Sequence, residues 1–293
     1  RLDSLPVVAS ERPDTRARIK LRVDGGRVGY RAARSHDLVA IDRCRIARPE
    51  VNAVIERLNA LAPEAFAEVE TIELRSDGER CVADVHGKRV SEALREALVD
   101  VALNGRVVAG DPTLWLSVAG LSLRASPGTF FQVNAAVNEA LVSWVVEQCA
   151  GATTVADLYA GIGNFTLPLA AAGHSVRSVE LNGPATHDLK ASAEQAGLSD
   201  RIEAVIGNAD RYDPTSAFVD AMVLDPPRRG CPELMRRIPT ARTPRVVLVS
   251  CDPRSAMRDT QILAKAGYRL VSAQAFDLFV DSHHLELATC WAR

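Results

Sequence analysis

The sequence predicts an α/β domain with a doubly wound, mostly parallel sheet, preceded by a smaller α+β domain. After residue 126, short apolar runs alternate with stretches of helical length, which is typical of parallel strands joined by helices. Before it, short strands are separated by hairpin signals such as Asp24-Gly25-Gly26. The pattern changes at Ser126-Pro127-Gly128. We therefore expect an unstructured lead-in over 1–15, the α+β domain over 16–125 and the doubly wound domain over 126–293.

In the α+β domain we expect strands at residues 19–23, 28–31, 38–41, 68–75, 81–85 and 114–123, and helices at about 50–61 and 91–103. The first helix follows Pro49, which suits a first helical turn. Its spacing places Val51, Val54, Ile55 and Leu58 on one face. The hairpin signals predict that these strands pair in antiparallel fashion.

In the second domain we expect strands at 154–158, 175–180, 202–206, 219–224, 246–249, 269–276 and 286–291, and helices at about 135–149, from 164, up to 196, and at 254–266. Only the loop 277–285 joins the last two strands. Because no helix fits between them, they are expected to form an antiparallel hairpin at the edge of the sheet.

Composition indicates an ordinary soluble globular protein. Of 293 residues, 47% are hydrophobic and 25% are charged, and no apolar run is long enough to cross a membrane. The six cysteines are scattered without a C-x-x-C pair, which favours a reducing, cytoplasmic setting over a disulfide scaffold. The chain begins with arginine, so a native segment upstream of it is one expectation.

Positive charge is concentrated in two stretches, although the net charge of −2 excludes a wholly basic nucleic-acid binder. Eleven Lys and Arg residues face four acidic residues between Arg12 and Arg48, and eight arginines face two acidic residues between Arg228 and Arg258. Surfaces of this kind suit a phosphate backbone. Two solvated faces would give the same counts.

The stretch Arg245–Pro253 predicts a buried strand that ends in a cysteine and a turn. Four apolar residues, Val246 to Val249, suit a central parallel strand, and Asp252-Pro253 ends it. Cys251 then lies at the carboxyl edge of the sheet, where open α/β sheets bind ligands. A thiol there is a candidate nucleophile, although most isolated cysteines are small buried hydrophobic residues.

The turn Asp157–Phe165 joins a strand to a helix and contains Gly161 and Gly163. It lacks the third glycine of a dinucleotide fingerprint, so pyrophosphate binding is disfavoured. Glu180 ends the next strand, where an acidic residue can accept hydrogen bonds from ribose hydroxyls. Together these features indicate S-adenosylmethionine. Asn208 and Asp210 follow the third strand and could reach the adenine or simply form a turn.

A second loop, Asp225-Pro226-Pro227-Arg228, follows the fourth strand. Its two prolines stiffen it and hold Asp225 at the ligand edge of the sheet. Methyltransferases that act on amines usually carry an aromatic ring after the prolines. Arg228 stands there instead, which argues against N-methylation of a base or a protein.

With these motifs the chain resembles the RNA uridine-C5 methyltransferases of the TrmA and RlmD type. The matching segments occur in family order: Phe130–Asn134, Asp157–Phe165, Asp225–Arg228, Ser250–Pro253 with Arg258-Asp259, and Phe276–Phe279 leading to His284–Glu286. The resemblance implies a Rossmann-like class I S-adenosylmethionine-dependent methyltransferase domain over 126–293. Residues 16–48 are similar to the central domain of the same family, which implies an RNA-contacting role for it.

The resemblance also implies the roles of individual residues. Cys251 is the expected nucleophile, Glu286 the base that removes the uracil C5 proton, and Asp225 the residue that positions uracil and cofactor. The expected contacts of S-adenosylmethionine are Gln132, Tyr159, Gly161, Asn164, Glu180, Asn208 and Asp225. Uracil C5 is a poor nucleophile, so a thiolate that adds to C6 makes C5 enolate-like before methyl transfer.

The thiol must ionise from a pKa of about 8.5. Arg254, Arg258 or the amino end of the following helix could assist it. His283 or His284 could influence Glu286, or each could be structural. Before Glu286, Val280-Asp281-Ser282 departs from the usual family pattern, and we expect an altered loop there with activity retained.

Many relatives carry an RNA-binding β-barrel and an iron–sulfur cluster held by four cysteines. Cys44 matches the fourth ligand, but the other three are absent from this chain. Either an upstream segment carries them, or Cys44 is a remnant in a cluster-free relative. Because one thiolate cannot hold a cluster, we expect neither a cluster nor another metal in this chain.

The sequence therefore predicts an enzyme that forms 5-methyluridine in RNA, in ribosomal RNA more than in transfer RNA. A different kind of answer is a non-enzymatic RNA-binding or folding factor that kept the fold. The presence of Cys251, Asp225 and Glu286 together argues against it. We expect a monomer with no membrane partner.

Overall fold

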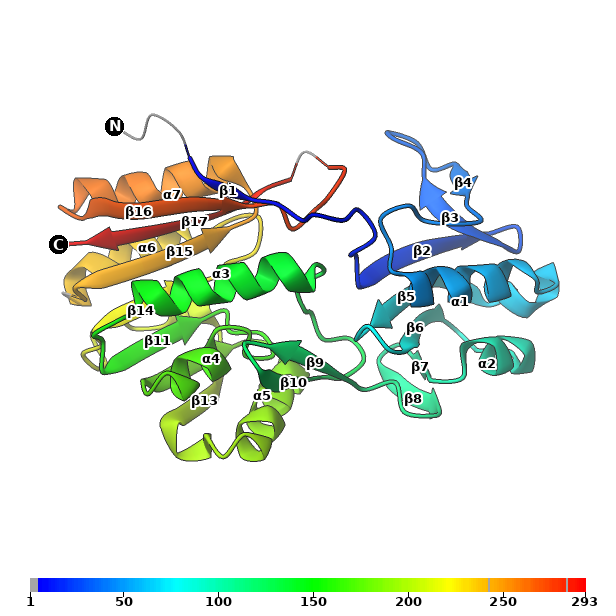
Figure 1. Ribbon diagram of the computed structural model, residues 1–293, viewed down its shortest axis with the longest axis horizontal. Helices are drawn as coiled ribbons and strands as arrows, with labels where there is room; N and C mark the ends of the chain where they lie inside the picture. Colours follow the sequence, from blue (N-terminus) through cyan, green and yellow to red (C-terminus); the bar gives the residue numbers. More distant parts are fainter. Residues whose placement is uncertain (1–4, 242, 283) are drawn as a thin grey trace. The chain divides into compact units, whose positions relative to one another are not determined.

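The computed structural model describes residues 5–241, 243–282 and 284–293, which form two compact units (Figure 1). The doubly wound unit comprises the N-terminal residues up to Ser10, Ser117–Arg124 and Thr129–Arg293. The α+β unit comprises Glu11–Leu116 and Ala125–Gly128. The sequence placed one boundary at residue 126, whereas in the structure the chain passes between the units several times.

The doubly wound unit is built on an eight-stranded sheet of order β1-β16-β17-β15-β14-β11-β12-β13. Its strands are β1 (Val7–Val8), β11 (Thr154–Leu158), β12 (Ser175–Glu180), β13 (Ile202–Ile206), β14 (Ala221–Leu224), β15 (Arg245–Ser250), β16 (Arg269–Phe276) and β17 (Glu286–Ala292). The pairs from β13 to β15 are parallel, and β17 is antiparallel to both neighbours. The chain order reverses between β11 and β14, and such switch points are where open α/β sheets bind ligands.

Helices connect these strands: α3 (Ala135–Gln148), α4 (Thr166–Ala171), α5 (Gly183–Gln195), α6 (Pro232–Arg237) and α7 (Pro253–Lys265), with short 3-10 turns at Ser199–Arg201, Ala209–Arg211 and Ile238–Ala241. The start of α7 is fixed by its sequence. The Asp252 side chain accepts from the backbone N–H groups of Arg254 and Ser255, and Pro253 occupies the first turn. Helix α6 was not predicted, because its six residues are too few to give a clear period.

The lead-in over 1–15 was expected to be unstructured; residues 1–4 lie outside the described residues, and the expectation is wrong at β1. Val7 and Val8 form β1, which pairs in parallel with Ala275 and Phe276 of β16. The amide of Ala275 donates to the carbonyl of Pro6, so an extended dipeptide satisfies backbone groups at the open edge of the sheet. A two-residue strand carries no periodic signal that a sequence could reveal.

The α+β unit has a seven-stranded sheet of order β4-β3-β2-β5-β6-β7-β8. Its strands are β2 (Arg18–Asp24), β3 (Arg27–Arg31), β4 (Leu38–Ala40), β5 (Val69–Ser76), β6 (Cys81–Gly87), β7 (Val101–Leu103) and β8 (Arg106–Ala109), with helices α1 (Pro49–Asn59) and α2 (Glu92–Leu98) and a 3-10 turn at Pro63–Phe66. The helix expected over 91–103 stops early because Val99 adopts a φ of +61°, which a helix cannot continue through. Residues 101–103 instead form β7, parallel to β6, so the expectation of purely antiparallel pairing is wrong there.

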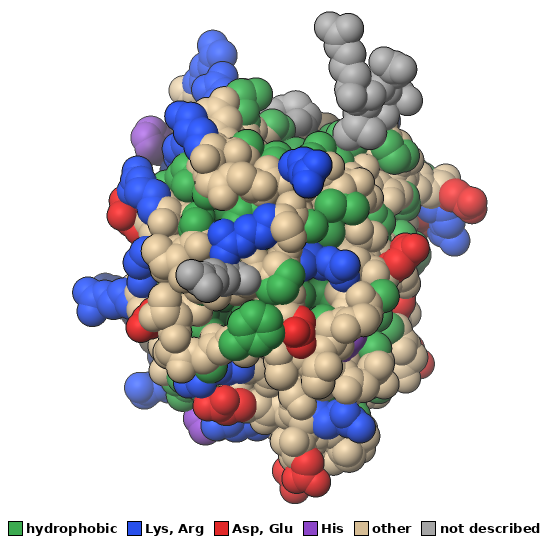
Figure 2. Space-filling model, turned by 90° about the vertical axis from the view of Figure 1, so that its left-hand side faces the viewer, with side chains coloured by type: hydrophobic (Ala, Val, Ile, Leu, Met, Phe, Trp, Pro, Cys, Tyr) green, Lys and Arg blue, Asp and Glu red, His purple; other side chains and the backbone are tan. Residues whose placement is uncertain are grey.

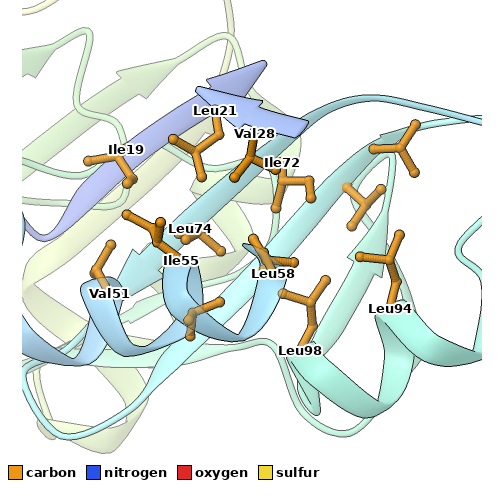
Figure 3. Close-up of a cluster of buried hydrophobic side chains, with 14 of the residues drawn as sticks. Ile19, Leu21, Val28, Val51, Ile55, Leu58, Ile72, Leu74, Leu94 and Leu98 are labelled. Atoms are coloured by element: carbon orange, nitrogen blue, oxygen red, sulfur yellow. The ribbon is translucent and has the colours of Figure 1, made fainter. Parts of the chain in front are cut away.

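The core of this unit lies between the sheet and its two helices (Figure 3). Val51, Val54, Ile55 and Leu58 of α1 are all buried, which confirms the face predicted from their spacing. They pack with alternate residues of the strands, including Ile19 and Leu21. Each such side chain contributes roughly 1.5–3 kcal/mol by leaving water.

The single strand expected over 114–123 is a hairpin of β9 (Leu114–Val118) and β10 (Leu121–Ala125). Ala119 and Gly120 form its turn with φ values of +51° and +74°, which match the right-handed twist of hairpin strands. Arg124 of β10 forms an ion pair of 2.5 Å with the buried Asp188 of α5. This contact explains why Ser117–Arg124 belongs to the doubly wound unit.

Candidate active site

Cys251 and Glu286 lie across from each other at the carboxyl edge of the sheet. β15 ends at Ser250, which pairs with Leu287 of the antiparallel strand β17. One step further in the same register sets Cys251 opposite Glu286, the first residue of β17. Cys251 is partly exposed, whereas the Glu286 side chain is only 2% exposed. A thiol that solvent can reach therefore lies beside a buried carboxyl group.

Asp225 and Arg228 reach the same place from the neighbouring strand. β14 pairs with β15 and ends at Leu224, so Asp225 is the next residue at the carboxyl edge. Asp225 is partly exposed and Arg228 is exposed. The guanidinium of Arg228 lies 3.4 Å from Nε2 of His284, which precedes β17. The two loops at this edge therefore approach one another.

The electrostatics show that these groups form one cluster. Burial, followed by the charge of Asp225, raises the pKa of Glu286 well above its ordinary value, and Arg228 opposes the rise. Burial, followed by Glu286 and Asp225, raises the pKa of the Cys251 thiol, and again Arg228 opposes it. Arg228 is thus the cation that favours the thiolate, a part that the sequence left open among Arg254, Arg258 and the helix terminus.

Arg254 and Arg258 are not among the main groups that shift the pKa of Cys251, and the structure describes other contacts for them. The backbone N–H of Arg254 donates to the Asp252 side chain at the start of α7. Arg258 donates to the Asp259 carboxylate at 3.0 Å and to the carbonyl of Arg229 at 2.6 Å. His283, the other histidine considered for Glu286, lies outside the described residues.

Glu286 and Asp225 also affect one another, which places two carboxyl groups in a site of low polarity. Burial raises the pKa of Asp225, and Asp157 adds to the rise. Oε1 of Glu286 is buried and has no hydrogen-bond partner among the described residues. Because Asp225 lies near Glu286, the charge of the Asp225 carboxylate makes ionisation of Glu286 more costly.

The turn after β11 brings Gly161 and Glu180 together. The Gly161 amide donates to Oε2 of Glu180 at 2.9 Å, and Oε1 of Glu180 accepts from the Asn182 amide at 2.7 Å. Gly161 has a φ of +56°, and a Cβ placed on it would meet nothing within 4 Å. Gly163 differs, because a Cβ there would lie 2.4 Å from Leu189 of α5. Gly161 therefore borders open space, while Gly163 permits close helix packing.

Asp157, the last residue but one of β11, is fully buried. Its Oδ2 accepts from the hydroxyl of Thr166 at 2.5 Å, and its Oδ1 has no partner among the described residues. Burial raises the pKa of Asp157 to about 7. The sequence assigned Asp157 and its turn to the binding of a compact ligand, whereas Thr166, whose hydroxyl donates to Asp157, carried no signal.

Tyr159 adopts a φ of +65°, which is uncommon for a residue other than glycine. Its hydroxyl donates to Oδ1 of Asp210 at 2.6 Å. Asn208 is exposed, and its side-chain oxygen accepts from the Asp210 amide at 2.9 Å, so Asn208 begins the turn that presents Asp210. Asp210 is thus a link to Tyr159, a role that the sequence did not assign.

Asn164 is paired with Asn138 of α3 through two amide hydrogen bonds, of 2.8 Å and 3.0 Å. Gln132 is partly exposed and lies just before Asn134, whose side chain accepts from Val137 at the start of α3. The amide pair fastens the first turns of α3, and with them the segment after Gln132, to the turn that contains Asn164. Asn138 was missed because a polar residue inside a helix is ordinarily exposed.

Cys44 lies in the α+β unit and is buried, with 8% of its surface exposed. The hydroxyl of Tyr30 donates to its sulfur at 3.4 Å, and its amide donates to Oδ1 of Asn52 at 2.8 Å. Within the described ranges, no group of three or more His, Cys, Asp or Glu residues is placed to hold a metal ion. Cys44 therefore has structural partners of its own.

The helices that the structure describes include none long and apolar enough to cross a membrane. On the face drawn in Figure 2, Lys and Arg side chains are interspersed with Asp, Glu and hydrophobic side chains. In this view, the end of the doubly wound unit at which β17 terminates faces the viewer.

Comparisons with known proteins agree with this geometry. Residues 111–205 match the family model described as tRNA (Uracil-5-)-methyltransferase. The 23S rRNA (uracil(1939)-C(5))-methyltransferase RlmD of Pseudomonas fluorescens is 36% identical over 92% of this chain and 66% of its own length. The protein of the same description from Dichelobacter nodosus is 32% identical over 96% of this chain and 72% of its own length. The chain thus spans about two thirds of the length of these relatives.

Among solved structures, the Pyrococcus abyssi tRNA (uracil-54, C5)-methyltransferase in complex with S-adenosyl-L-homocysteine superposes with a TM-score of 0.84. It is 23% identical, and the match covers 98% of this chain and 79% of that one. A putative S-adenosylmethionine-dependent methyltransferase from Streptococcus mutans matches with a TM-score of 0.56 over 75% of this chain. The fold is therefore that of the class I methyltransferases, as the sequence predicted.

Proposed function

Because the chain belongs to the RNA uracil-C5 methyltransferase family, we propose that it transfers a methyl group from S-adenosylmethionine to C5 of a uridine in RNA. The observation that carries the proposal is the opposition of Cys251 and Glu286 across β15 and β17. The reaction needs a nucleophile and a base on one pyrimidine. Asp225, from the adjacent strand, supplies a third polar group at the same edge.

In the proposed reaction the Cys251 thiolate adds to C6 of the uracil, and the electron pair of the C5–C6 bond makes C5 enolate-like. Bound S-adenosylmethionine would supply the methyl group that bonds to C5, and S-adenosylhomocysteine would be the leaving group. Glu286 then removes the C5 proton, and the electrons of that C–H bond reform the C5–C6 double bond as the Cys251–C6 bond breaks. The thiolate is thereby restored, and the C5 proton leaves on Glu286.

The charges around the site support this division of roles. Arg228 lowers the pKa of both Cys251 and Glu286, so it favours the two ionised forms that the reaction uses. Burial acts in the opposite direction and raises the pKa of Glu286, which makes its carboxylate a stronger base once it has formed. Asp225 is expected to hold the uracil ring between these groups.

The residues expected to bind S-adenosylmethionine fit a ligand of that shape. Gly161 borders open space next to Glu180, whose oxygens can still accept from ribose hydroxyls. Oδ1 of Asp157, which has no hydrogen-bond partner among the residues that the structure describes, offers a further polar atom near the turn. We assign Gln132, Tyr159, Asn164 and Asn208 to the same site, as the family resemblance implies.

For the substrate we propose ribosomal RNA, because the proteins named as RlmD act on 23S rRNA and are similar over more than nine tenths of this chain. Near the site, the exposed arginines include Arg228 and Arg229 in the loop after Asp225, and Arg254 in the first turn of α7. The exposed Lys20, Arg27, Arg31 and Arg34 of the α+β unit give a second cationic surface. Such residues neutralise RNA phosphates. We further propose that the protein acts as a cytoplasmic monomer.

The test is to incubate the purified protein and S-adenosylmethionine with unmodified 23S rRNA or transfer RNA, and to map 5-methyluridine by nuclease digestion and mass spectrometry. We expect the product in 23S rRNA. The variant Cys251→Ala should make none while still binding S-adenosylhomocysteine, and Cys81→Ala, in the other unit, is the matched cysteine control. Activity that survives Cys251→Ala would exclude the covalent route, and product in transfer RNA alone would correct the substrate.

A further inference from the structure

One loop residue, Arg229, is held from two sides at once. Its guanidinium bonds Oδ2 of Asp210, which follows β13. Its backbone carbonyl accepts from Nη2 of Arg258 in α7 at 2.6 Å. Arg229 lies directly after Arg228 in the loop that begins at Asp225. The loop that carries Asp225 and Arg228 is therefore bonded to Asp210 on one side. On the other side it is bonded to α7, the helix that follows Cys251.

Asp210 connects Arg229 to Tyr159, which lies in the turn after β11 and is assigned to the cofactor. While Oδ2 of Asp210 meets Arg229, Oδ1 accepts the Tyr159 hydroxyl at 2.6 Å. Arg237 donates to the carbonyls of Asp210 and Tyr212 and so fixes this turn. Burial acts to raise the pKa of Asp210, but the hydrogen bonds from Tyr159 and Arg229 outweigh it and lower the pKa. Asp210 is therefore an anion that holds both partners at neutral pH.

The connection toward the nucleophile runs through α7. Arg258 also donates to Oδ1 of Asp259, and Oδ2 of Asp259 accepts from the Cys231 amide at 2.7 Å. Asp259 is only 1% exposed. Between these contacts, Gly230 has a φ of +69°, and a Cβ on it would lie 2.2 Å from Asp259 and 2.5 Å from Arg258. The loop therefore sits against α7 without room to shift toward it.

From this arrangement we propose that Arg229 is a positioning residue that couples S-adenosylmethionine binding to RNA binding. The inference rests on the proposed function, because Tyr159 is assigned to the cofactor and Asp225 to the uracil. A ligand that restrains Tyr159 also restrains Asp210 and Arg229. The loop has then already lost conformational entropy, so the second ligand binds with a smaller entropic penalty. The side chain of Arg229 is 67% exposed, and exposed ion pairs contribute little to folding stability. Substitution of Arg229 should therefore change the coupling between the two ligands and leave the folding stability nearly unchanged.

The experiment measures the affinity of S-adenosylhomocysteine by calorimetry, with and without an unmodified 23S rRNA transcript. In the unaltered protein we expect RNA to tighten this binding by roughly fivefold or more, the lower range of ordinary coupling. Arg229→Gln should reduce the enhancement to about twofold or less, and Asp210→Asn should do the same because the Tyr159 acceptor remains while the anion is lost. Arg229→Lys, which keeps the cation, should restore part of it.

Arg236→Gln is the matched control, since Arg236 is an equally exposed arginine of α6 whose carboxylate partner, Glu233, lies on the same helix. It should retain the full enhancement. The proposal is overturned if Arg229→Gln keeps the enhancement of the unaltered protein, or if the unaltered protein shows none. Failure of the proposed function is a separate result: the same protein preparations would then form no 5-methyluridine in RNA.

Discussion

Cys251 and Glu286 lie together at the end of the β15–β17 ladder, because Cys251 directly follows Ser250 and Glu286 directly precedes Leu287, the partner of Ser250. The antiparallel strand β17, inserted beside the parallel strands, makes this possible. A neighbouring strand parallel to β15 would end at this edge, so its first residue would lie at the opposite edge of the sheet. The C-terminal hairpin thus brings the carboxyl group of Glu286, the proposed base, to the edge at which Cys251, the proposed nucleophile, lies.

The charge of Arg228 should set the pH dependence of the reaction. Burial raises the pKa of Cys251, Glu286 and Asp225 add to the rise, and Arg228 opposes it. Arg228→Gln removes that opposition, so the pKa of Cys251 rises further and the ascending limb of kcat/KM moves to higher pH. Activity near neutral pH should fall several-fold. A limb that moves with Arg254→Gln and stays in place with Arg228→Gln would contradict the assignment.

Gly230 should be intolerant of a side chain. Its φ of +69° and its contact with Asp259 penalise Gly230→Ala twice. Gly197 has nearly the same φ, +68°, with nothing within 4 Å, so Gly197→Ala isolates the backbone strain. Urea unfolding should show a loss of about 1–2 kcal/mol for Gly197→Ala, and a further ~1–3 kcal/mol for Gly230→Ala from overpacking. Only Gly230→Ala should also lose activity, and equal effects of the two variants would refute the packing argument.

Asp157 should make the protein less stable as pH rises. Burial raises its pKa to about 7 from an ordinary value of 3.8, so the folded state binds a proton that the unfolded state has lost. The stabilising effect of that proton is complete below pH 3.8 and disappears as pH rises through 7. Asp157→Asn should therefore reduce the fall in unfolding free energy between pH 5 and 8 by on the order of 2 kcal/mol. The unfolding free energy is measured by denaturant titration at the two pH values. If it falls as much in Asp157→Asn as in the unaltered protein, another group is responsible.

Much of the fold followed from the sequence, because periodicity reports burial directly. The strands Thr154–Leu158 and Arg245–Ser250 and the buried face of α1 were predicted within a residue or two. The failures have physical causes. Val99 ends α2 through a backbone conformation that no pattern reveals, and β1 gains its place from a partner far along the chain.

For the site, the sequence suggested residues but not their connections. Asp225 and Cys251 were proposed from their places after strand ends and Glu286 from the family resemblance, and the structure supplies the register that brings Cys251 and Glu286 together. The link from Tyr159 through Asp210 to Arg229 joins three separate segments. Such a link depends on side-chain directions, which a single sequence does not contain.

The most direct test of the account uses Glu286→Gln, which keeps the shape of the side chain and removes the base. With unmodified 23S rRNA and S-adenosylmethionine, we expect this variant to accumulate an RNA–protein complex that resists denaturation, because the C5 proton has no acceptor and Cys251 cannot leave. Digestion and mass spectrometry should find a methylated uridine nucleotide on the Cys251 peptide, and none when Cys251→Ala is added. Turnover at the unaltered rate with no adduct, or an adduct at another residue, would contradict the account.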